Sequence, residues 1–311
     1  MRTRLGRPVK ARCSRRRPLR AATVRSVKRF RYVLVDVFTD RALEGNQLAV
    51  FTNATGLPEA MLQKLARELN LSETVFVYPP SSRAEAHVKV RIFTTEEELL
   101  FAGHPVLGTA FVMGIPLQAV EVLLETGMGI VPVVLERDGA RIIFGWMRQP
   151  LPTVAPFGEA ETVELLAALG VAGSLLPVEI YDNGVRHVFV GLGSQDEVAA
   201  LRPDQNRLAA LGRIGVNCFA GDGLFWKLRM FAPGKGISED PATGSGAGPL
   251  ALHLARHGRI AFGDEIVIAQ GAEVNRPSTL YARAEGSADE LLAIQVGGSA
   301  VVVARGEFQL A

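Results

Sequence analysis

The segment that most constrains this chain is residues 238–250, SEDPATGSGAGPL, in which two carboxylates and a proline precede a run of small residues. A helical pattern of apolar residues follows and continues to about Gly258. Small residues at the start of a helix let a ligand approach the backbone, and the first helical N–H groups favour an anion. Two interpretations stay open for this segment alone: a site for a carboxylate-bearing molecule beside an acid, or a tight turn capped by Asp or Thr.

A second helix start of the same kind lies at residues 101–105, FAGHP, and leads into a predicted helix over 106–113. His104 precedes a proline there, as Asp240 does about 136 residues later. Two such units indicate two similar lobes that face each other. The proline-rich stretch 150–156 is the candidate boundary between them.

Strand patterns outnumber helical patterns along the chain. Residues 86–93 alternate apolar and polar side chains, which predicts a half-buried strand, whereas residues 57–70 repeat apolar side chains at helical spacing. Further strands are expected near 30–37, 47–51, 75–78, 179–181, 187–190, 224–231, 265–269, 279–284, 291–296 and 300–304. This mixture favours an α+β chain of two mixed lobes over a regular βαβ array.

The charge of the chain is unevenly distributed. Residues 1–31 hold 13 of the 34 Lys and Arg side chains and no acid, so the other 280 residues carry 21 bases and 32 acids, a net charge of −11. We therefore expect an acidic folded part, for which nucleic-acid binding is unlikely. Residues 1–29 are predicted to be a basic disordered arm; a transit-like peptide and a nucleic-acid arm are the alternatives.

Two cysteines, Cys13 and Cys218, do not suggest a disulfide framework, and this favours a cytoplasmic location. We find no run of 18 apolar residues, so no membrane span is expected. No metal site is expected either. His253 and His257 have i, i+4 spacing but lack the intervening glutamate of zinc peptidases, so they are interpreted as exposed helix histidines.

Dinucleotide binding and nucleophile triads are poorly supported. The glycines at 244–248 lack the spacing of a dinucleotide loop, and Ser245 lacks the motif of a nucleophile elbow. Acid–base chemistry remains, with Glu73, His104 and Asp240 as candidates. Each stands among apolar or small residues, where burial can bring a pKa toward neutrality.

Eight motifs together resemble the PhzF family of phenazine-biosynthesis proteins, in that family's order, over about residues 32–310. They are VDVFT at 35–39, GNQLAV at 45–50, NLSET at 70–74, RIFT at 91–94, FAGHP at 101–105, EDPATGS at 239–245, QG at 270–271 and RPS at 276–278. Two positions depart from the family pattern: Gln47 replaces a common proline, and Gly246 replaces a usual alanine.

The resemblance implies a fold like that of diaminopimelate epimerase. This fold has two pseudo-symmetric lobes, each a curled mixed sheet around a central helix, with the site in the cleft between them. The N-terminal lobe is predicted at 30–148 and the C-terminal lobe at 149–290, with strands in 291–311 returning to the first lobe. A homodimer is also implied.

The resemblance further implies an isomerase that works without a cofactor, as in the proton shift of trans-2,3-dihydro-3-hydroxyanthranilate. Its motifs assign the moving proton to Glu73, with His104 and Asp240 assisting. Ser245 is expected to line the substrate site together with Gly103 and Gly244, and the substrate is a small carboxylate-bearing molecule.

Related epimerases use two cysteines, one on each face of the substrate. Cys13 lies in the basic arm and Cys218 lies outside the motifs, so a two-thiol racemase is disfavoured. A carboxylate-based epimerase or a dehydratase is the enzymatic alternative to the isomerase. A small-molecule-binding protein without catalytic activity is the alternative from another class.

Overall fold

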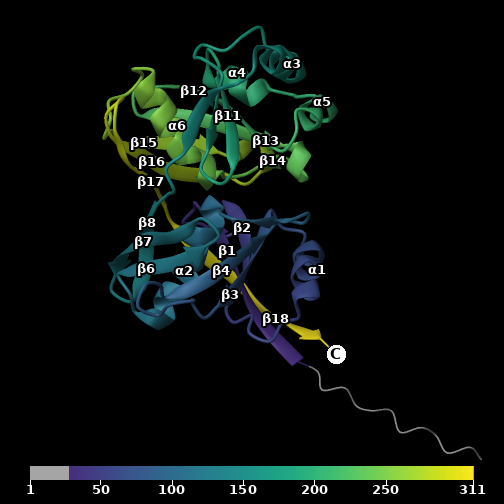
Figure 1. The fold of residues 1–311 in the computed structure, drawn as a ribbon, viewed down its shortest axis with the longest axis vertical. Coiled ribbons are helices and arrows are strands. Elements are labelled where there is room, and N and C mark those ends of the chain that lie inside the picture. Colours follow the sequence, from purple (N-terminus) through teal and green to yellow (C-terminus); the bar gives the residue numbers. More distant parts are fainter. Residues whose placement is uncertain (1–27, 311) are drawn as a thin grey trace, which may run out of the picture.

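The structure, a computed structural model, describes residues 28–310 and consists of two lobes stacked along the long axis of the molecule (Figure 1). The predicted arm, residues 1–29, lies outside the described residues except for its last two. Lys28 and Arg29 are not part of an arm: they begin strand β1 (Lys28–Val37), where Lys28 is opposite Leu310 and Arg29 forms an ion pair with Glu307 at 3.2 Å.

The N-terminal lobe is a curled sheet around helix α2 (Gly103–Leu117). Every residue of α2 from Gly103 to Val112 is buried, because the helix is apolar on all sides and therefore fits the centre of a lobe. The other elements of this lobe are β1 (Lys28–Val37), β2 (Asn46–Phe51), α1 (Glu59–Leu69), β3 (Glu73–Tyr78), β4 (Val88–Phe93), β5 (Glu98–Leu99), β6 (Glu121–Thr126), β7 (Gly129–Asp138) and β8 (Arg141–Arg148).

The C-terminal lobe repeats this plan around helix α6 (Gly244–Arg256), which is buried from Gly244 to Ala255. Helices α3 (Glu159–Leu169), α4 (Gln195–Ala200) and α5 (Gln205–Ala210) cover a separate apolar cluster on its outer side. The other elements are β9 (Thr153–Pro156), α3 (Glu159–Leu169), β10 (Glu179–Asp182), β11 (Arg186–Gly191), α4 (Gln195–Ala200), α5 (Gln205–Ala210), β12 (Gly215–Asp222), β13 (Phe225–Ala232), β14 (Ile237–Asp240), β15 (Ile266–Gln270), β16 (Ser278–Gly286) and β17 (Leu291–Gly298).

Backbone pairing connects the two lobes. Strand β17 pairs with β16 of the C-terminal lobe and with β8 of the N-terminal lobe, where Val296 is opposite Met147. Strand β18 (Ala300–Leu310) then runs antiparallel to β1 along its full length (Figure 1). The two central helices are also in contact, so the core is continuous from one lobe to the other. The α+β fold expected from the sequence is confirmed, and the lobe boundaries at residues 148 and 290 remain predictions.

Within residues 28–310, none of the helices combines the length and the apolar character that crossing a membrane requires.

Candidate active site

The first turns of the two central helices meet at the junction of the lobes. A Cβ atom on Gly103 would collide with the backbone of Gly244 and Ser245, so only glycine allows this approach. Neither N-cap residue, Ala102 or Thr243, caps its helix through a side-chain hydrogen bond. The free N–H groups at both helix starts therefore offer donors to an anionic ligand.

Glu73 is the first residue of β3, which lies parallel to β2, and its side chain points toward the start of α2. Only 7% of Glu73 is exposed, and its Oε2 atom lies 3.3 Å from Nε2 of His104. Burial, together with the nearby charge of Asp240, raises the pKa of the Glu73 carboxyl well above its usual value. A carboxyl group in this environment is suited to give and take a proton near neutral pH.

Asn46, at the start of β2, connects the two lobes within this site. Its Nδ2 atom donates to Oδ1 of Asp240 at 2.7 Å and to the carbonyl oxygen of Ala242 at 2.9 Å, and it lies 3.2 Å from Nδ1 of His104. Burial lowers the pKa of His104 to about 3, so this imidazole is neutral at physiological pH. His104 therefore faces Glu73 as a neutral ring and not as a counter-ion.

Asp240 ends β14 and is held by a network from its own lobe. The hydroxyl of Thr243 donates to Oδ2 of Asp240 at 2.6 Å, and Gln270 Nε2 donates to the Asp240 carbonyl oxygen at 2.8 Å and to Thr243 Oγ1 at 2.9 Å. Burial raises the pKa of Asp240 to about 6, while the hydrogen bonds from Thr243 and Asn46 oppose that rise. Asp240 is therefore ionised at neutral pH but titrates close to it.

Ser245, in the first turn of α6, faces a buried histidine that the sequence analysis did not select. Its Oγ atom lies 3.0 Å from Nε2 of His187 on β11, and Asn217 Nδ2 lies 3.2 Å from Nδ1 of the same ring. Burial lowers the pKa of His187 to about 3, so it too is neutral. An added Cβ on Gly246 would lie 2.9 Å from Asn217 Oδ1, which explains glycine at this departure from the family pattern.

A small cavity joins these groups, with a volume of about 30 Å³. Glu73, His104, Asp240, Gly103, Gly244 and Ser245, the six residues singled out from the sequence, all line it. Lys235, which the sequence analysis also missed, lines it as well, and burial lowers the pKa of its ammonium group. Because the cavity has room for little more than a water molecule, the lobes or side chains must move before a substrate enters.

The missed residues differ in how far the sequence could have revealed them. Asn46 and Gln270 stand inside quoted family motifs, so their positions were visible although no role was assigned to them. His187 and Lys235 lie outside every motif, and only the folded chain brings them to the cavity.

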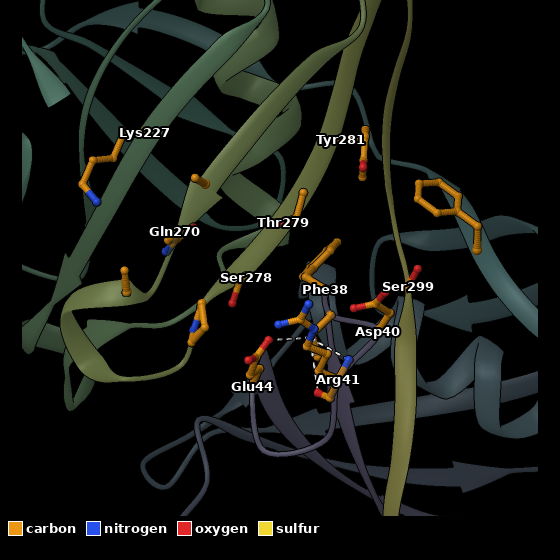
Figure 2. Close-up of a pocket in the computed structure, with 15 residues that line it drawn as sticks. Phe38, Asp40, Arg41, Glu44, Lys227, Gln270, Ser278, Thr279, Tyr281 and Ser299 are labelled. Atoms are coloured by element: carbon orange, nitrogen blue, oxygen red, sulfur yellow. Dashed lines mark hydrogen bonds between the residues drawn. The ribbon is translucent and has the colours of Figure 1, made fainter.

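Figure 2 shows a larger neighbouring cavity of about 470 Å³, with Phe38, Arg41 and Glu44 from one lobe and Lys227 and Tyr281 from the other. None of the three candidate acid–base residues lines it. Gln270 lines it while its amide group holds Thr243 and Asp240, so this side chain separates the two cavities. The three candidate acid–base residues therefore all lie at the smaller cavity.

The interpretation of His253 and His257 as exposed histidines is wrong. His253 is fully buried, because strands β10 to β12 cover this side of α6 and pack Tyr181, Phe189 and Phe219 against its ring. Both histidines lie at the C-terminal end of α6, away from the cavity that Ser245 lines.

Comparison with known proteins shows similarity along most of the chain. Residues 35–306 match the family model PhzC-PhzF, described as phenazine biosynthesis-like protein. The chain is 49% identical to a trans-2,3-dihydro-3-hydroxyanthranilate isomerase of Pseudomonas fluorescens over 279 residues, which are 90% of this chain and 99% of the relative.

Solved structures share the fold. A PhzF-family protein of Bacillus anthracis aligns with a TM-score of 0.78 at 23% identity, over 91% of this chain and all of the other. A hydroxyproline epimerase of Agrobacterium vitis aligns with a TM-score of 0.61 at 13% identity, over 91% of this chain and 93% of the epimerase. The second likeness supports the diaminopimelate epimerase-like architecture expected from the sequence.

Proposed function

This chain belongs to the phenazine biosynthesis-like PhzC-PhzF family and is an isomerase, and we propose that it moves a proton within a small carboxylate substrate, with Glu73 as the proton carrier. One observation carries the assignment of Glu73. Its carboxyl group is buried, with an Oε2 atom that has no hydrogen-bond partner among residues 28–310, at the junction of two helix N-termini. Burying a carboxyl without such partners costs stability, and proton transfer is a reason to keep it.

The proton shift requires only one carboxyl group. Ionised Glu73 removes a proton from a carbon atom next to a double bond, and the C–H electron pair becomes part of a new C=C bond. The original double bond breaks, and its π electron pair forms the new C–H bond when protonated Glu73 returns the proton to the far carbon. The atoms and electrons of substrate and enzyme balance, and no oxidant or reductant takes part.

The neighbouring residues adjust the charge of Glu73. The negative charge of Asp240 favours the protonated carboxyl, whereas the positive charge of Lys235 favours the ionised form. Neutral His104 can exchange a hydrogen bond with either form of Glu73, because an imidazole ring nitrogen can donate or accept according to its tautomer. These influences keep Glu73 able to change its protonation state during one turnover.

We assign the substrate carboxylate to the cationic side of the cavity. Lys235 and the free N–H groups at the starts of α2 and α6, with Gly103, Gly244 and Ser245, would hold it. Ionised Asp240 would accept a hydrogen bond from a substrate amino or hydroxyl group. The name of the Pseudomonas fluorescens relative makes dihydro-3-hydroxyanthranilate the first compound to test.

A carboxylate-based epimerase or a dehydratase is the second candidate, favoured by the fold likeness to the hydroxyproline epimerase. A two-thiol mechanism has no support in residues 28–310, because Cys218 is buried in β12 and does not line the cavity. The similarity to a named isomerase sets aside the binding-protein alternative.

Proton NMR in D2O tests this proposal. We expect the wild-type protein to shift a double bond of dihydro-3-hydroxyanthranilate and to incorporate deuterium at the carbon that receives the proton. The Glu73→Gln variant should show neither change, and hydroxyproline should stay unaltered in both samples. Deuterium at Cα of hydroxyproline would support the epimerase instead, and equal turnover by the Gln variant would remove Glu73 from the mechanism.

We also propose that the protein acts as a homodimer in the cytoplasm. Exposed apolar side chains on β7, Ile130 at 42% and Val134 at 48%, support a surface that a second copy could cover. The free thiol of Cys218 is compatible with a reducing compartment. Light scattering of the eluting protein should give twice the mass of one chain, and a Val134→Asp variant should give the mass of one.

A further inference from the structure

We propose that Glu179, His253 and His257 form a binding site for one divalent transition-metal ion, with Zn²⁺ as the best-suited ion. Glu179 begins β10, and the two histidines stand one helical turn apart at the end of α6. One potential ligand atom from each side chain lies within 4.8 Å of the other two. Two imidazoles and one carboxylate are a ligand set that zinc uses in proteins.

The distances suit a tetrahedral ion. Oε2 of Glu179 lies 3.2 Å from Nδ1 of His253 and 3.0 Å from Nε2 of His257. Ligand bonds of about 2.0–2.1 Å at tetrahedral angles separate neighbouring ligand atoms by about 3.3 Å. An ion could therefore enter among these atoms with only small side-chain movements.

The site is rigid and largely shielded from water. His253 is fully buried, with its ring stacked on Phe189 at 5.5 Å, while Glu179 and His257 remain 12% and 21% exposed. Packing thus fixes the most buried ligand, and the exposed edge at His257 gives an ion a path to enter. A preformed arrangement lowers the entropy cost of binding.

The alternative is a hydrogen-bonded cluster that holds α6 against β10 without a metal. Four groups lie within hydrogen-bonding distance of the single oxygen Oε2 of Glu179: ring nitrogens of His253 and His257, which donate or accept according to tautomer, the Tyr181 hydroxyl at 2.8 Å and Arg256 Nη1 at 3.3 Å. One carboxylate oxygen offers about two lone pairs, so it cannot accept from all four at once. A cation bound by the imidazole nitrogens and this oxygen would resolve the excess of donors.

Arg256 and Tyr181 decide how the ion would be accommodated. The Arg256 guanidinium now supplies a positive charge next to the Glu179 carboxylate. Its side chain is 33% exposed, so it can turn toward solvent when an ion binds. Tyr181 Oη lies 3.1 Å from His253 Nδ1, which places it where a fourth ligand or an orienting hydrogen-bond partner would stand.

The ion would have a structural role. His257 follows Ser245 by 12 residues, which is about 18 Å along a helix axis. The metal would therefore attach the far end of the central helix to the sheet, and the proposed proton transfer would not involve it.

Zinc titration of the untagged full-length protein, stripped of metal beforehand, tests the site. Competition with a chromophoric chelator should show one tight equivalent of Zn²⁺ per chain and a higher Tm. His257→Gln and Glu179→Gln should weaken that binding at least tenfold, whereas His87→Gln, at an exposed histidine elsewhere, should not. Circular dichroism confirms that each variant is folded.

Arg256→Gln separates the two explanations. If a metal site exists, removing the competing positive charge should tighten zinc binding, and Co²⁺ should give the intense visible absorption of a tetrahedral complex. If the residues form only a hydrogen-bonded cluster, the wild type and the His257→Gln variant will bind zinc equally weakly or not at all. That result would overturn the proposal. These readouts do not depend on isomerase activity, so they stand apart from the assignment of Glu73.

Discussion

The Oε2 atom of Glu73 lies 3.3 Å from the Nε2 atom of His104, and neither atom has a hydrogen-bond partner within residues 28–310. A buried carboxyl facing a neutral imidazole in this way is costly to fold. The free-energy cost of burial is largest when Glu73 is ionised. The stability of the protein therefore depends on pH in a predictable direction.

Glu73→Gln should stabilise the fold at high pH. The folded chain holds the Glu73 proton more tightly than the unfolded chain, so this group lowers the free energy of unfolding as the pH rises above 4.5. Glutamine does not titrate and does not repel Asp240. The Tm of the variant should therefore exceed that of the wild type by a few degrees at pH 8, and the difference should disappear near pH 4. A Tm that is lower at pH 8 would show that the Glu73 charge is compensated in the fold.

Thr243→Val should move the acidic limb of the kcat/KM profile to higher pH. The Thr243 hydroxyl donates to ionised Asp240 and opposes the rise of its pKa above about 6. A hydrogen bond to a charged group contributes roughly 1.5–3 kcal/mol, which corresponds to a movement of about one pH unit or more. Thr109→Val is the matched control, because this buried hydroxyl on α2 has no partner among the described residues. An unmoved limb would mean that ionised Asp240 is not required.

Lys235→Met should raise KM for a carboxylate substrate at least tenfold. The variant loses the half-buried positive charge in the small cavity, and charge-assisted hydrogen bonds are among the stronger polar contacts. Lys227→Met is the control: Lys227 lines the larger cavity in Figure 2 and is paired with Glu273 at 2.6 Å. If the control variant loses affinity and the Lys235 variant keeps it, the substrate binds in the larger cavity.

Local patterns in the sequence predicted the α+β class, whereas the two-lobed fold and the roles proposed for Glu73, His104 and Asp240 came from the family resemblance. A helix with apolar side chains all round belongs in a core, and the motifs around Glu73, His104 and Asp240 are contiguous in the chain. His187 and Lys235 reach the cavity only through the pairing of separate strands and turns, which no local pattern encodes.

The misjudged histidines have a related cause. The spacing of His253 and His257 places them on one side of a helix, but it does not say what covers that side. In the structure β10 covers it and contributes Glu179, a residue more than 70 positions earlier in the chain. Burial and the third ligand group were therefore invisible from the helix sequence.

Gly103→Ala should damage both stability and turnover. The added methyl group would meet the backbone of Gly244 and Ser245, and backbone atoms cannot move aside as a flexible side chain can. Overpacking of this kind costs about 1–3 kcal/mol, and here it would also separate the two helix N-termini proposed to hold the substrate. The urea midpoint should fall together with kcat/KM. Gly173→Ala is the control, because nothing lies within 4 Å of its added Cβ. If both variants unfold at the wild-type midpoint and remain active, the close approach of the two helices has no importance for folding or for the site.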